Sequence, residues 1–297
     1  MFNYEEVKFP GLGINIEVNS VAFKIGSISV YWYGILIALA LIISVFLAVK
    51  QSKKLNFPEG LVYDTILMII PCAIIGARAY YVACNWDYYK QDWKLIFDTR
   101  SGGLAIYGGV ILVFIGGFIM CTIRKIPYRE LADYCVVYLP LGQAIGRWGN
   151  FFNQEAFGTT TSLPWGMTSP SVEQFLRMNC QTLVPTMPVH PTFLYESICD
   201  LIIFVVLLYV RKHSKIPFET SCIYFILYGT ARFFLEGLRT DSLYIGHTSI
   251  RISQLLSLVF VVAGLAYIAI ARTKKIEKKG FPEKLYEGAL TGEGNKK

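Results

Sequence analysis

The sequence predicts an all-α polytopic membrane protein with seven transmembrane helices. Three observations support this fold class. Hydrophobic residues make up 54% of the 297-residue chain and charged residues only 16%, whereas soluble proteins carry about 25% charged residues. The mean hydropathy is +0.45. The apolar residues also gather in long segments, and lysine and arginine are concentrated in alternate connections between them.

The predicted spans follow from the thickness of a bilayer. A hydrocarbon core of about 30 Å requires about 20 predominantly apolar residues of helix. No stretch before the first apolar segment resembles a cleavable signal peptide. The seven segments of sufficient length are residues 28–49, 61–83, 103–123, 131–151, 192–210, 220–238 and 250–271.

The distribution of positive charge predicts the orientation. The connections after spans one, three and five, together with the tail, hold 17 lysines and arginines, whereas the opposite side holds eight. By the positive-inside rule, the side with 17 is cytoplasmic. The amino terminus is therefore expected outside and the carboxyl terminus inside. Because the net charge of +7 reflects this distribution, it does not indicate nucleic-acid binding.

The spans divide the chain into three parts. We expect an outer amino-terminal arm over residues 1–27, a transmembrane domain over 28–271 and a basic cytoplasmic tail over 272–297. The connection over 152–191 is rich in Thr, Ser, Pro and Gly and is too long for a simple link. It predicts a small irregular extracytoplasmic cap.

A polar motif, GRWGNFFNQEAFG, occupies residues 146–158 at the outer end of span four. A charged side chain at mid-bilayer costs about 2.5–3.5 kcal/mol, so Arg147 and Glu155 require a reason for their position. Gln143, Arg147 and Asn150 share one helical face, which is expected to line a cavity or another helix. The motif indicates a site that handles a lipid head group.

Span six carries a second polar face, formed by Arg232, Glu236 and Arg239. Arg232 and Glu236 have the spacing of an intrahelical ion pair. Alternatively, Arg232 and Arg147 converge on a phosphate, since planar guanidinium groups suit phosphate oxygens better than an ammonium group does. The sequence leaves both interpretations open.

Two further motifs lie at the outer ends of spans one and three. Tyr33 belongs to WYG, and Gly102, Gly103 and Tyr107 belong to SGGLAIYGG. Closely spaced glycines allow the backbone to approach a ligand or a neighbouring helix. For both tyrosines, the alternative to a place in the site is the aromatic belt at the membrane interface.

Arg78 and His190 are the remaining candidates. Arg78 lies within span two, where it either contacts a ligand, extends to the outer head groups or pairs with a carboxylate. His190 lies near the outer surface among polar neighbours. The three histidines are scattered and the seven cysteines form no CxxC pair, so we expect no metal, and no cofactor motif is present.

Together these motifs resemble the prolipoprotein diacylglyceryl transferase family. The resemblance covers nearly the whole chain except the extreme tail. It rests on the motif at 146–158, WYG at 32–34, GAR at 76–78, GGLAIYGG at 102–109, HPTFLYE at 190–196 and RFFLE at 232–236.

The resemblance implies an enzyme of the bacterial plasma membrane with its active site toward the outer face. Its expected reaction moves a diacylglyceryl group from phosphatidylglycerol to the lipobox cysteine of a prolipoprotein signal peptide, forming a thioether and releasing glycerol phosphate. The expected partners are therefore phosphatidylglycerol, the signal peptide and the bilayer. The family's catalytic roles map onto Tyr33, Arg147, Asn150, Glu155, Gly158, Arg232 and Glu236, to which we add Tyr107.

The roles expected of these residues follow from the chemistry. Fixed cations stabilise charge that develops on a leaving phosphate, so Arg147 and Arg232 are assigned to it. Asn150 is expected to bind a head-group or glyceryl oxygen. The other candidates for binding phosphatidylglycerol are Gly102, Gly103 and Arg78.

The base is the open assignment, because many family members carry His where this chain has Tyr107. Tyr107, His190 and Glu155 are the candidates for it. The main alternative function is a membrane transporter of an anion or lipid. Such a protein would place polar groups through both halves of the membrane, whereas here the arginines within the spans cluster toward the outside.

Overall fold

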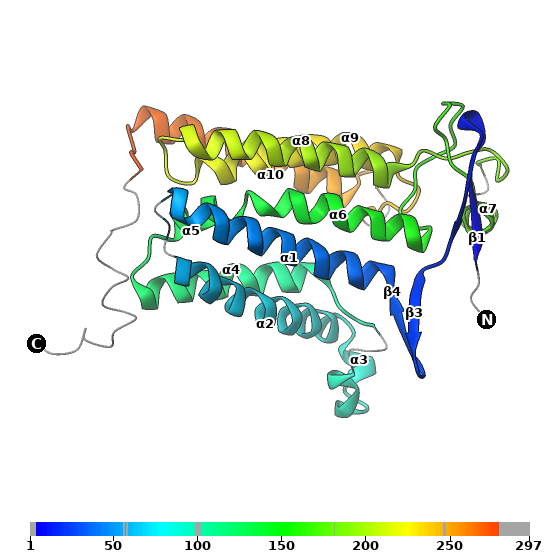
Figure 1. Cartoon of the computed structure of the whole chain (residues 1–297), viewed down its shortest axis with the longest axis horizontal. Coiled ribbons are helices and arrows are strands. Elements are labelled where there is room, and N and C mark those ends of the chain that lie inside the picture. Colours follow the sequence, from blue (N-terminus) through cyan, green and yellow to red (C-terminus); the bar gives the residue numbers. More distant parts are fainter. Residues whose placement is uncertain are drawn as a thin grey trace, which may run out of the picture. The chain divides into compact units, whose positions relative to one another are not determined.

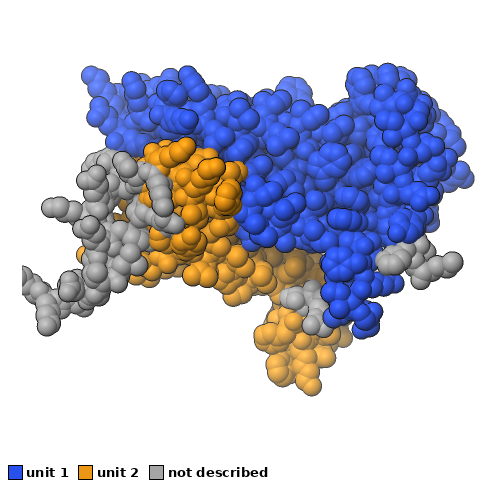
Figure 2. All heavy atoms as spheres, in the orientation of Figure 1, with its two compact units in different colours: residues 1–44, 132–278 blue, residues 45–131, 279–297 orange. Residues whose placement is uncertain are grey.

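The protein is described by a computed structural model, which describes residues 4–55, 57, 59–98, 102–180, 182–245 and 248–278. The chain divides into two compact units (Figure 2). Unit 1 comprises Met1–Ser44 and Ala132–Lys278, and unit 2 comprises Val45–Leu131 and Lys279–Lys297. Most of the predicted tail, residues 279–297, lies outside the described residues. Two helices, α1 (Trp32–Ser52) and α5 (Tyr128–Cys135), contain the boundaries between the units.

Four long helices of unit 1 pack in succession. They are α6 (Tyr138–Asn153), α8 (Thr192–His213), α9 (Glu219–Leu238) and α10 (Ile252–Thr273). Helix α6 packs on α8, α8 on α9, and α9 on α10 (Figure 1). The carboxyl ends of α6 and α9 therefore meet the amino end of α8, which brings three polar motifs of the sequence together.

Two β-hairpins precede these helices. Strands β1 (Glu5–Phe9) and β2 (Ile14–Val18) pair antiparallel around η1 (Pro10–Leu12), and β3 (Val21–Ile25) pairs with β4 (Ile28–Tyr31). The second hairpin turns at Gly26, whose φ of 61° is readily adopted by glycine. The chain is thus predominantly helical with a small β component that the sequence analysis did not identify.

The predicted arm and the predicted cap share one hydrophobic core. The backbone of Lys8 on β1 pairs with that of Thr168, and helix α7 (Pro170–Asn179) packs on β1. Ser169 caps α7 by accepting a hydrogen bond from the amide of Val172. The fully buried members of this core are Val7, Met167, Val172, Leu176 and Val189.

Unit 2 is built around one helix pair. Helix α2 (Glu59–Cys84) packs on α4 (Ile106–Arg124), and η2 (Lys53–Leu55), α3 (Trp86–Tyr89) and η3 (Trp93–Phe97) complete the unit. The two helices cross at Gly76 and Gly108, where a Cβ on either residue would clash with the backbone of the other helix. These glycines therefore serve close helix packing.

Five of the seven predicted spans correspond to described helices that are long and apolar enough to cross a membrane. They are α1, α2, α4, α8 and α10. The first begins at Trp32 rather than residue 28, because β4 occupies the preceding residues. Span six corresponds to α9, whose Glu219, Arg232 and Glu236 add charge to an otherwise apolar segment.

Predicted span four is two helices rather than one. Helix α5 ends at Cys135, and the 16-residue α6 begins at Tyr138. Pro140 explains the break, because a proline ring clashes with the carbonyl four residues earlier, at Val136. Asp133 then holds α5 in place by accepting hydrogen bonds from the amide and hydroxyl of Ser221 on α9, both at 2.8 Å.

Candidate active site

Three arginines of unit 1 surround one carboxylate, that of Glu196 on α8. Glu196 forms ion pairs with Arg147 at 2.5 Å, with Arg232 at 3.0 Å and with Arg239 at 3.5 Å. Its side chain is only 5% exposed. Arg147 comes from α6, and Arg232 and Arg239 come from the end of α9, so the site depends on the packing of three helices.

Two more carboxylates complete the arginine–carboxylate cluster. Glu236 pairs with Arg232 at 2.7 Å, and Asp241 pairs with Arg239 at 2.6 Å. The cluster consists of Arg147, Arg232, Arg239, Glu196, Glu236 and Asp241, so three positive charges face three negative ones.

The pair at the edge of the cluster is held in its charged form. Burial alone would raise the pKa of Asp241, but the hydrogen bonds and charge of Arg239 lower it below the usual value. Burial likewise opposes the charge of Arg239, and the nearby carboxylates, Asp241 first, raise its pKa above the usual value. Both groups are therefore ionised at neutral pH.

The structure confirms one interpretation of span six, the intrahelical ion pair, and leaves the phosphate contact a prediction. Arg232 and Glu236 form the intrahelical ion pair, and Arg232 also converges with Arg147. The group on which the two arginines converge is Glu196. Their side chains remain 18% and 20% exposed, respectively, whereas Glu196 is buried beside them. Since a guanidinium has five N–H donors, each arginine has donors left for a ligand.

A polar branch extends from Arg147 toward the end of α6. Arg147 Nη1 lies 3.5 Å from Asn150 Oδ1, and Asn150 Nδ2 donates to Glu155 Oε1 at 2.9 Å. Asn153 Nδ2 donates to the same carboxylate oxygen at 3.2 Å. Helix α6 ends where Gln154 adopts a left-handed conformation, with φ of 52°. This turn brings the exposed Glu155 back beside Asn150.

Two glycines of the 146–158 motif allow close packing within the site. A Cβ at Gly149 would clash with the ring of Tyr33, so this glycine is what lets α1 place Tyr33 against α6. A Cβ at Gly158 would lie 2.8 Å from His190 Cβ and 3.1 Å from the carbonyl oxygen of Leu238. Gly158 therefore allows the segment before α8 to pack closely against the end of α9.

His190 lies beside Gly158 and contacts Tyr195. Its Nδ1 is 3.2 Å from the Tyr195 hydroxyl, which in turn accepts a hydrogen bond from Trp165 Nε1 at 2.7 Å. Because Trp165 donates to the hydroxyl oxygen, the Tyr195 proton is available to His190 Nδ1. Burial lowers the pKa of His190, so its ring is neutral at pH 7.

The other predicted site residues lie in unit 2, where Arg78 holds a loop together. Its Nε, Nη1 and Nη2 donate five hydrogen bonds, at 2.5–3.0 Å, to backbone carbonyls of η3 and of the loop that leads to α4. Two of the acceptors are Gly102 and Gly103, whose φ angles of 93° and 76° favour glycine. This geometry favours a loop-holding role for Arg78 over the predicted contact with phosphatidylglycerol.

Tyr107 stands at the start of α4 and is 47% exposed. It follows the loop that Arg78 holds, so its backbone position is fixed by Gly103 and by the packing of Gly108 on α2. A side chain that is half exposed next to a fixed loop can contact a substrate. Among the described residues, no group of three His, Cys, Asp or Glu is placed to hold a metal ion.

Three members of the cluster are not among the site residues predicted from the sequence: Glu196, Arg239 and Asp241. Glu196 is the central one, because it joins all three arginines. The available signal was a carboxylate within the apolar segment 192–210, which by default marks a functional position. Asp200, one turn further along α8 and 2% exposed, carries the same signal.

Comparison with known proteins identifies the family of the chain. Residues 20–270 match the family described as prolipoprotein diacylglyceryl transferase. The chain is similar to the phosphatidylglycerol–prolipoprotein diacylglyceryl transferase of Finegoldia magna, with 46% identity over 84% of this chain and 94% of that protein. The relative of the same name in Clostridioides difficile is 42% identical over 87% of this chain and 98% of that protein. The one in Oceanobacillus iheyensis is 41% identical over 88% of this chain and 91% of that protein.

Proposed function

We propose a mechanism from the premise that the chain belongs to the prolipoprotein diacylglyceryl transferase family. The protein is a membrane-embedded transferase that moves a diacylglyceryl group from phosphatidylglycerol to a prolipoprotein. The transporter alternative is not favoured. The observation that carries the mechanism is the convergence of Arg147 and Arg232 on the buried Glu196, which leaves both guanidinium groups partly exposed.

The arginines hold the phosphate of phosphatidylglycerol. The acceptor is the lipobox cysteine of the prolipoprotein, whose sulfur attacks the glyceryl carbon that bears the phosphate. The sulfur–carbon bond forms as the carbon–oxygen bond breaks, and the electron pair stays on the phosphate oxygen of the departing glycerol phosphate. Arg147 and Arg232 stabilise this added negative charge, and losing one such donor typically costs about 10²–10³-fold in rate.

Glu196 is a positioning residue in this mechanism. Its carboxylate fixes three guanidinium groups from two helices before the substrate arrives, so little reorganisation is required in the transition state. Glu236 positions Arg232 in the same way, at 2.7 Å. Asn150 is placed between Arg147 and Glu155, where it can bind a head-group or glyceryl oxygen.

Glu155 is the proposed base for the cysteine thiol. An ordinary thiol has a pKa of about 8.5, so its deprotonation at pH 7 is a modest cost. Glu155 is exposed and is joined to Arg147 through Asn150, so it can contact a thiol that approaches the phosphate-bearing carbon. His190 is less suitable because Tyr195 occupies its Nδ1.

Variants distinguish the candidate bases. Glu155→Gln keeps an acceptor for Asn150 but removes the basic carboxylate, so kcat should fall about 10²-fold. Tyr107→Phe removes only a hydroxyl group and should retain kcat within about threefold. If instead Tyr107→Phe lost activity and Glu155→Gln kept it, Tyr107 would be the base. Glu173→Gln on α7 is the matched control for the loss of a carboxylate.

The proposed membrane arrangement has seven spans, with the amino terminus outside and the site toward the outer face of the bacterial plasma membrane. One support is the predominance of lysine and arginine in alternate connections. The other is the position of the cluster at one end of the helix bundle, where α6 ends at Asn153, α8 begins at Thr192 and α9 ends at Leu238. In this arrangement α6 and α9 are the additional spans. Arg147 on α6 and Arg232 and Glu236 on α9 pair within the cluster rather than facing lipid.

Reconstitution tests the function directly. The purified protein is incubated with phosphatidylglycerol vesicles and a lipobox peptide, and the peptide is analysed by mass spectrometry. We expect a diacylglyceryl adduct on the cysteine and none on a peptide with serine at that position. If the cysteine peptide gave no adduct under conditions where a relative is active, the proposed function would be wrong.

A further inference from the structure

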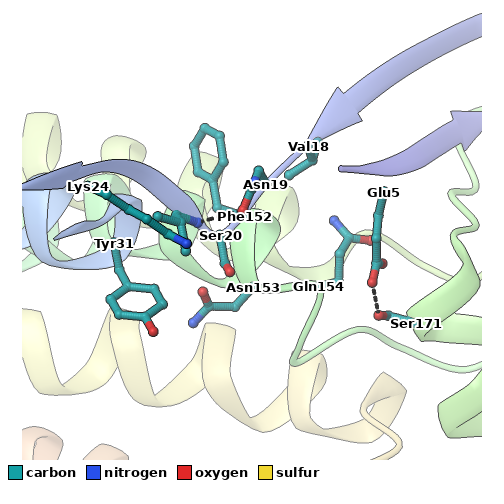
Figure 3. Close-up of a pocket in the computed structure, with 11 residues that line it drawn as sticks. Glu5, Val18, Asn19, Ser20, Lys24, Tyr31, Phe152, Asn153, Gln154 and Ser171 are labelled. Atoms are coloured by element: carbon teal, nitrogen blue, oxygen red, sulfur yellow. Dashed lines mark hydrogen bonds between the residues drawn. The ribbon is translucent and has the colours of Figure 1, made fainter. Parts of the chain in front are cut away.

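A polar hollow of about 320 Å³ lies beside the end of α6 (Figure 3). Its wall is formed by the link between β2 and β3, by the β3–β4 hairpin, by the start of β1 and by the residues that end α6. We name it the amino-terminal hollow. Its lining includes Glu5, Asn19, Lys24, Asn153 and Gln154.

Three lining residues carry buried polar atoms that lack a hydrogen-bond partner among the described residues. These atoms are Glu5 Oε2, Asn19 Nδ2 and Gln154 Oε1. Gln154 is only 7% exposed. Native structures leave few such atoms unsatisfied, so a wall that holds three of them indicates a site completed by a ligand.

The opposite atoms of the same side chains are fixed. Glu5 Oε1 accepts a hydrogen bond from Ser171 Oγ at 2.6 Å, and Asn19 Oδ1 accepts one from the amide of Val21 at 2.8 Å. Gln154 Nε2 donates to the Phe151 carbonyl oxygen. The walls are thus pre-organised, with one unused donor and two unused acceptors held in place.

The ligand must therefore present both donors and acceptors and carry little net charge. Two acceptors and one donor complement the N–H and C=O groups of a polypeptide main chain. The lining includes one carboxylate, Glu5, and one ammonium group, Lys24, so it has no excess of charge that would select an ion. The volume also exceeds what a glycerol head group requires.

One residue links the hollow to the candidate active site. Asn153 lines it and also donates to Glu155 Oε1 at 3.2 Å. Except for the end of α6, its lining belongs to strands, to connections and to α7, all outside the candidate spans. Gln154, the neighbour of Glu155, lines the hollow. A polypeptide whose cysteine lies at Glu155 could therefore place its hydrophilic segment in this polar site.

We propose that the amino-terminal hollow binds the main chain of the prolipoprotein segment that follows the acceptor cysteine. This inference rests on the proposed function, because the proposed function supplies the polypeptide substrate. The hollow would give the enzyme affinity for the residues after the lipobox, independently of the arginines that hold the lipid.

Adjacent residues of β1 provide a matched test. Glu5→Gln keeps an acceptor for Ser171 but replaces the unused acceptor by a donor, whereas Glu6→Gln makes the same change outside the hollow. Two peptides are compared, one ending at the lipobox cysteine and one extending several residues beyond it. Glu5→Gln should raise KM for the long peptide about 5–10-fold, the effect of losing one hydrogen bond, with kcat unchanged.

The other measured constants should stay at wild-type values. For Glu5→Gln, these are KM for the short peptide and KM for phosphatidylglycerol. For Glu6→Gln, they are KM for the short peptide and KM for the long peptide. Asn19→Asp, which keeps the acceptor for Val21 and loses the donor, is a second variant, and Asn15→Asp on β2 is its matched control. Thermal unfolding in detergent tests whether each variant is folded. If Glu5→Gln does not fold, the KM values of Asn19→Asp test the inference instead.

Three results would overturn the inference. Equal changes for both peptides would mean that the hollow acts on the fold of the site. A rise in KM for phosphatidylglycerol alone would assign the hollow to the lipid head group, and no change in any constant would leave it without a substrate. These results differ from failure of the proposed function, in which the wild-type protein would form no adduct on either peptide.

Discussion

Replacing Glu196 by glutamine tests the arginine–carboxylate cluster most directly. The change keeps the size of the side chain and removes one negative charge. Arg232 and Arg239 keep Glu236 and Asp241 as partners, at 2.7 and 2.6 Å. Arg147 instead loses the one ion-pair partner that it has among the described residues.

The expected magnitude follows from the burial of this pair. Removing one partner of a buried ion pair costs about 3–5 kcal/mol. Arg147 is 20% exposed and can recover some hydration, so we take the lower figure of about 3 kcal/mol. That cost is a loss of folding stability. Because a misplaced Arg147 no longer stabilises the leaving phosphate, kcat should also fall about 10²-fold, the effect of losing one such donor. KM for phosphatidylglycerol should not rise, because the released guanidinium stays cationic.

The assay is the transfer reaction with both substrates varied, together with thermal unfolding of the detergent-solubilised protein. Glu196→Asp keeps the charge on a shorter side chain and should recover part of the rate. Glu173→Gln is the control, because its partner Arg177 is exposed and lies 3.9 Å away, where an ion pair contributes little. A Glu196→Gln protein that is folded and has the wild-type kcat would refute the positioning role.

Three further predictions concern single residues of the site. Arg147→Lys keeps the charge but loses the planar fork, so kcat should fall at least tenfold in the transfer assay, whereas Arg177→Lys on α7 should have no effect. Gly149→Ala places a methyl group against the Tyr33 ring and should lower stability by about 1–3 kcal/mol, measured by thermal unfolding; an unchanged Tm would contradict the close packing. Burial lowers the pKa of His190, so the folded protein holds the ring neutral while the unfolded chain takes up a proton below about pH 6.5. Stability should therefore fall as the pH drops through about 6.5, and His190→Gln should reduce that dependence; identical pH profiles would show that His190 is not responsible.

The sequence predicted most of the helices because a membrane span needs only length and apolar composition. It failed where local chemistry overrides composition. Residues 28–31 are mostly apolar, yet they pair with β3 because Gly26 permits a tight turn. Likewise, Pro140 divides an apolar run that hydropathy alone treats as one span.

The site was partly predictable for a related reason. Helical spacing places Arg232 and Glu236 on one face, and the structure contains that pair. Spacing within a helix cannot tell which side chain another helix contributes, so the link through Glu196 was missed. Arg78 illustrates the reverse case: an arginine in an apolar span suggested a ligand, whereas its five donors bind a loop remote in sequence.

The break at Pro140 has a consequence for the lipid around the protein. Helix α6 has 16 residues and is therefore about 24 Å long, shorter than a hydrocarbon core of about 30 Å. A span that is too short is accommodated by thinning of the adjacent bilayer. In the proposed membrane arrangement, the leaflet at the cluster end of α6 should then dip toward Arg147, so that a phospholipid reaches the guanidinium groups without leaving its own monolayer. Turnover should accordingly be faster in vesicles of short-chain lipids than in thick bilayers.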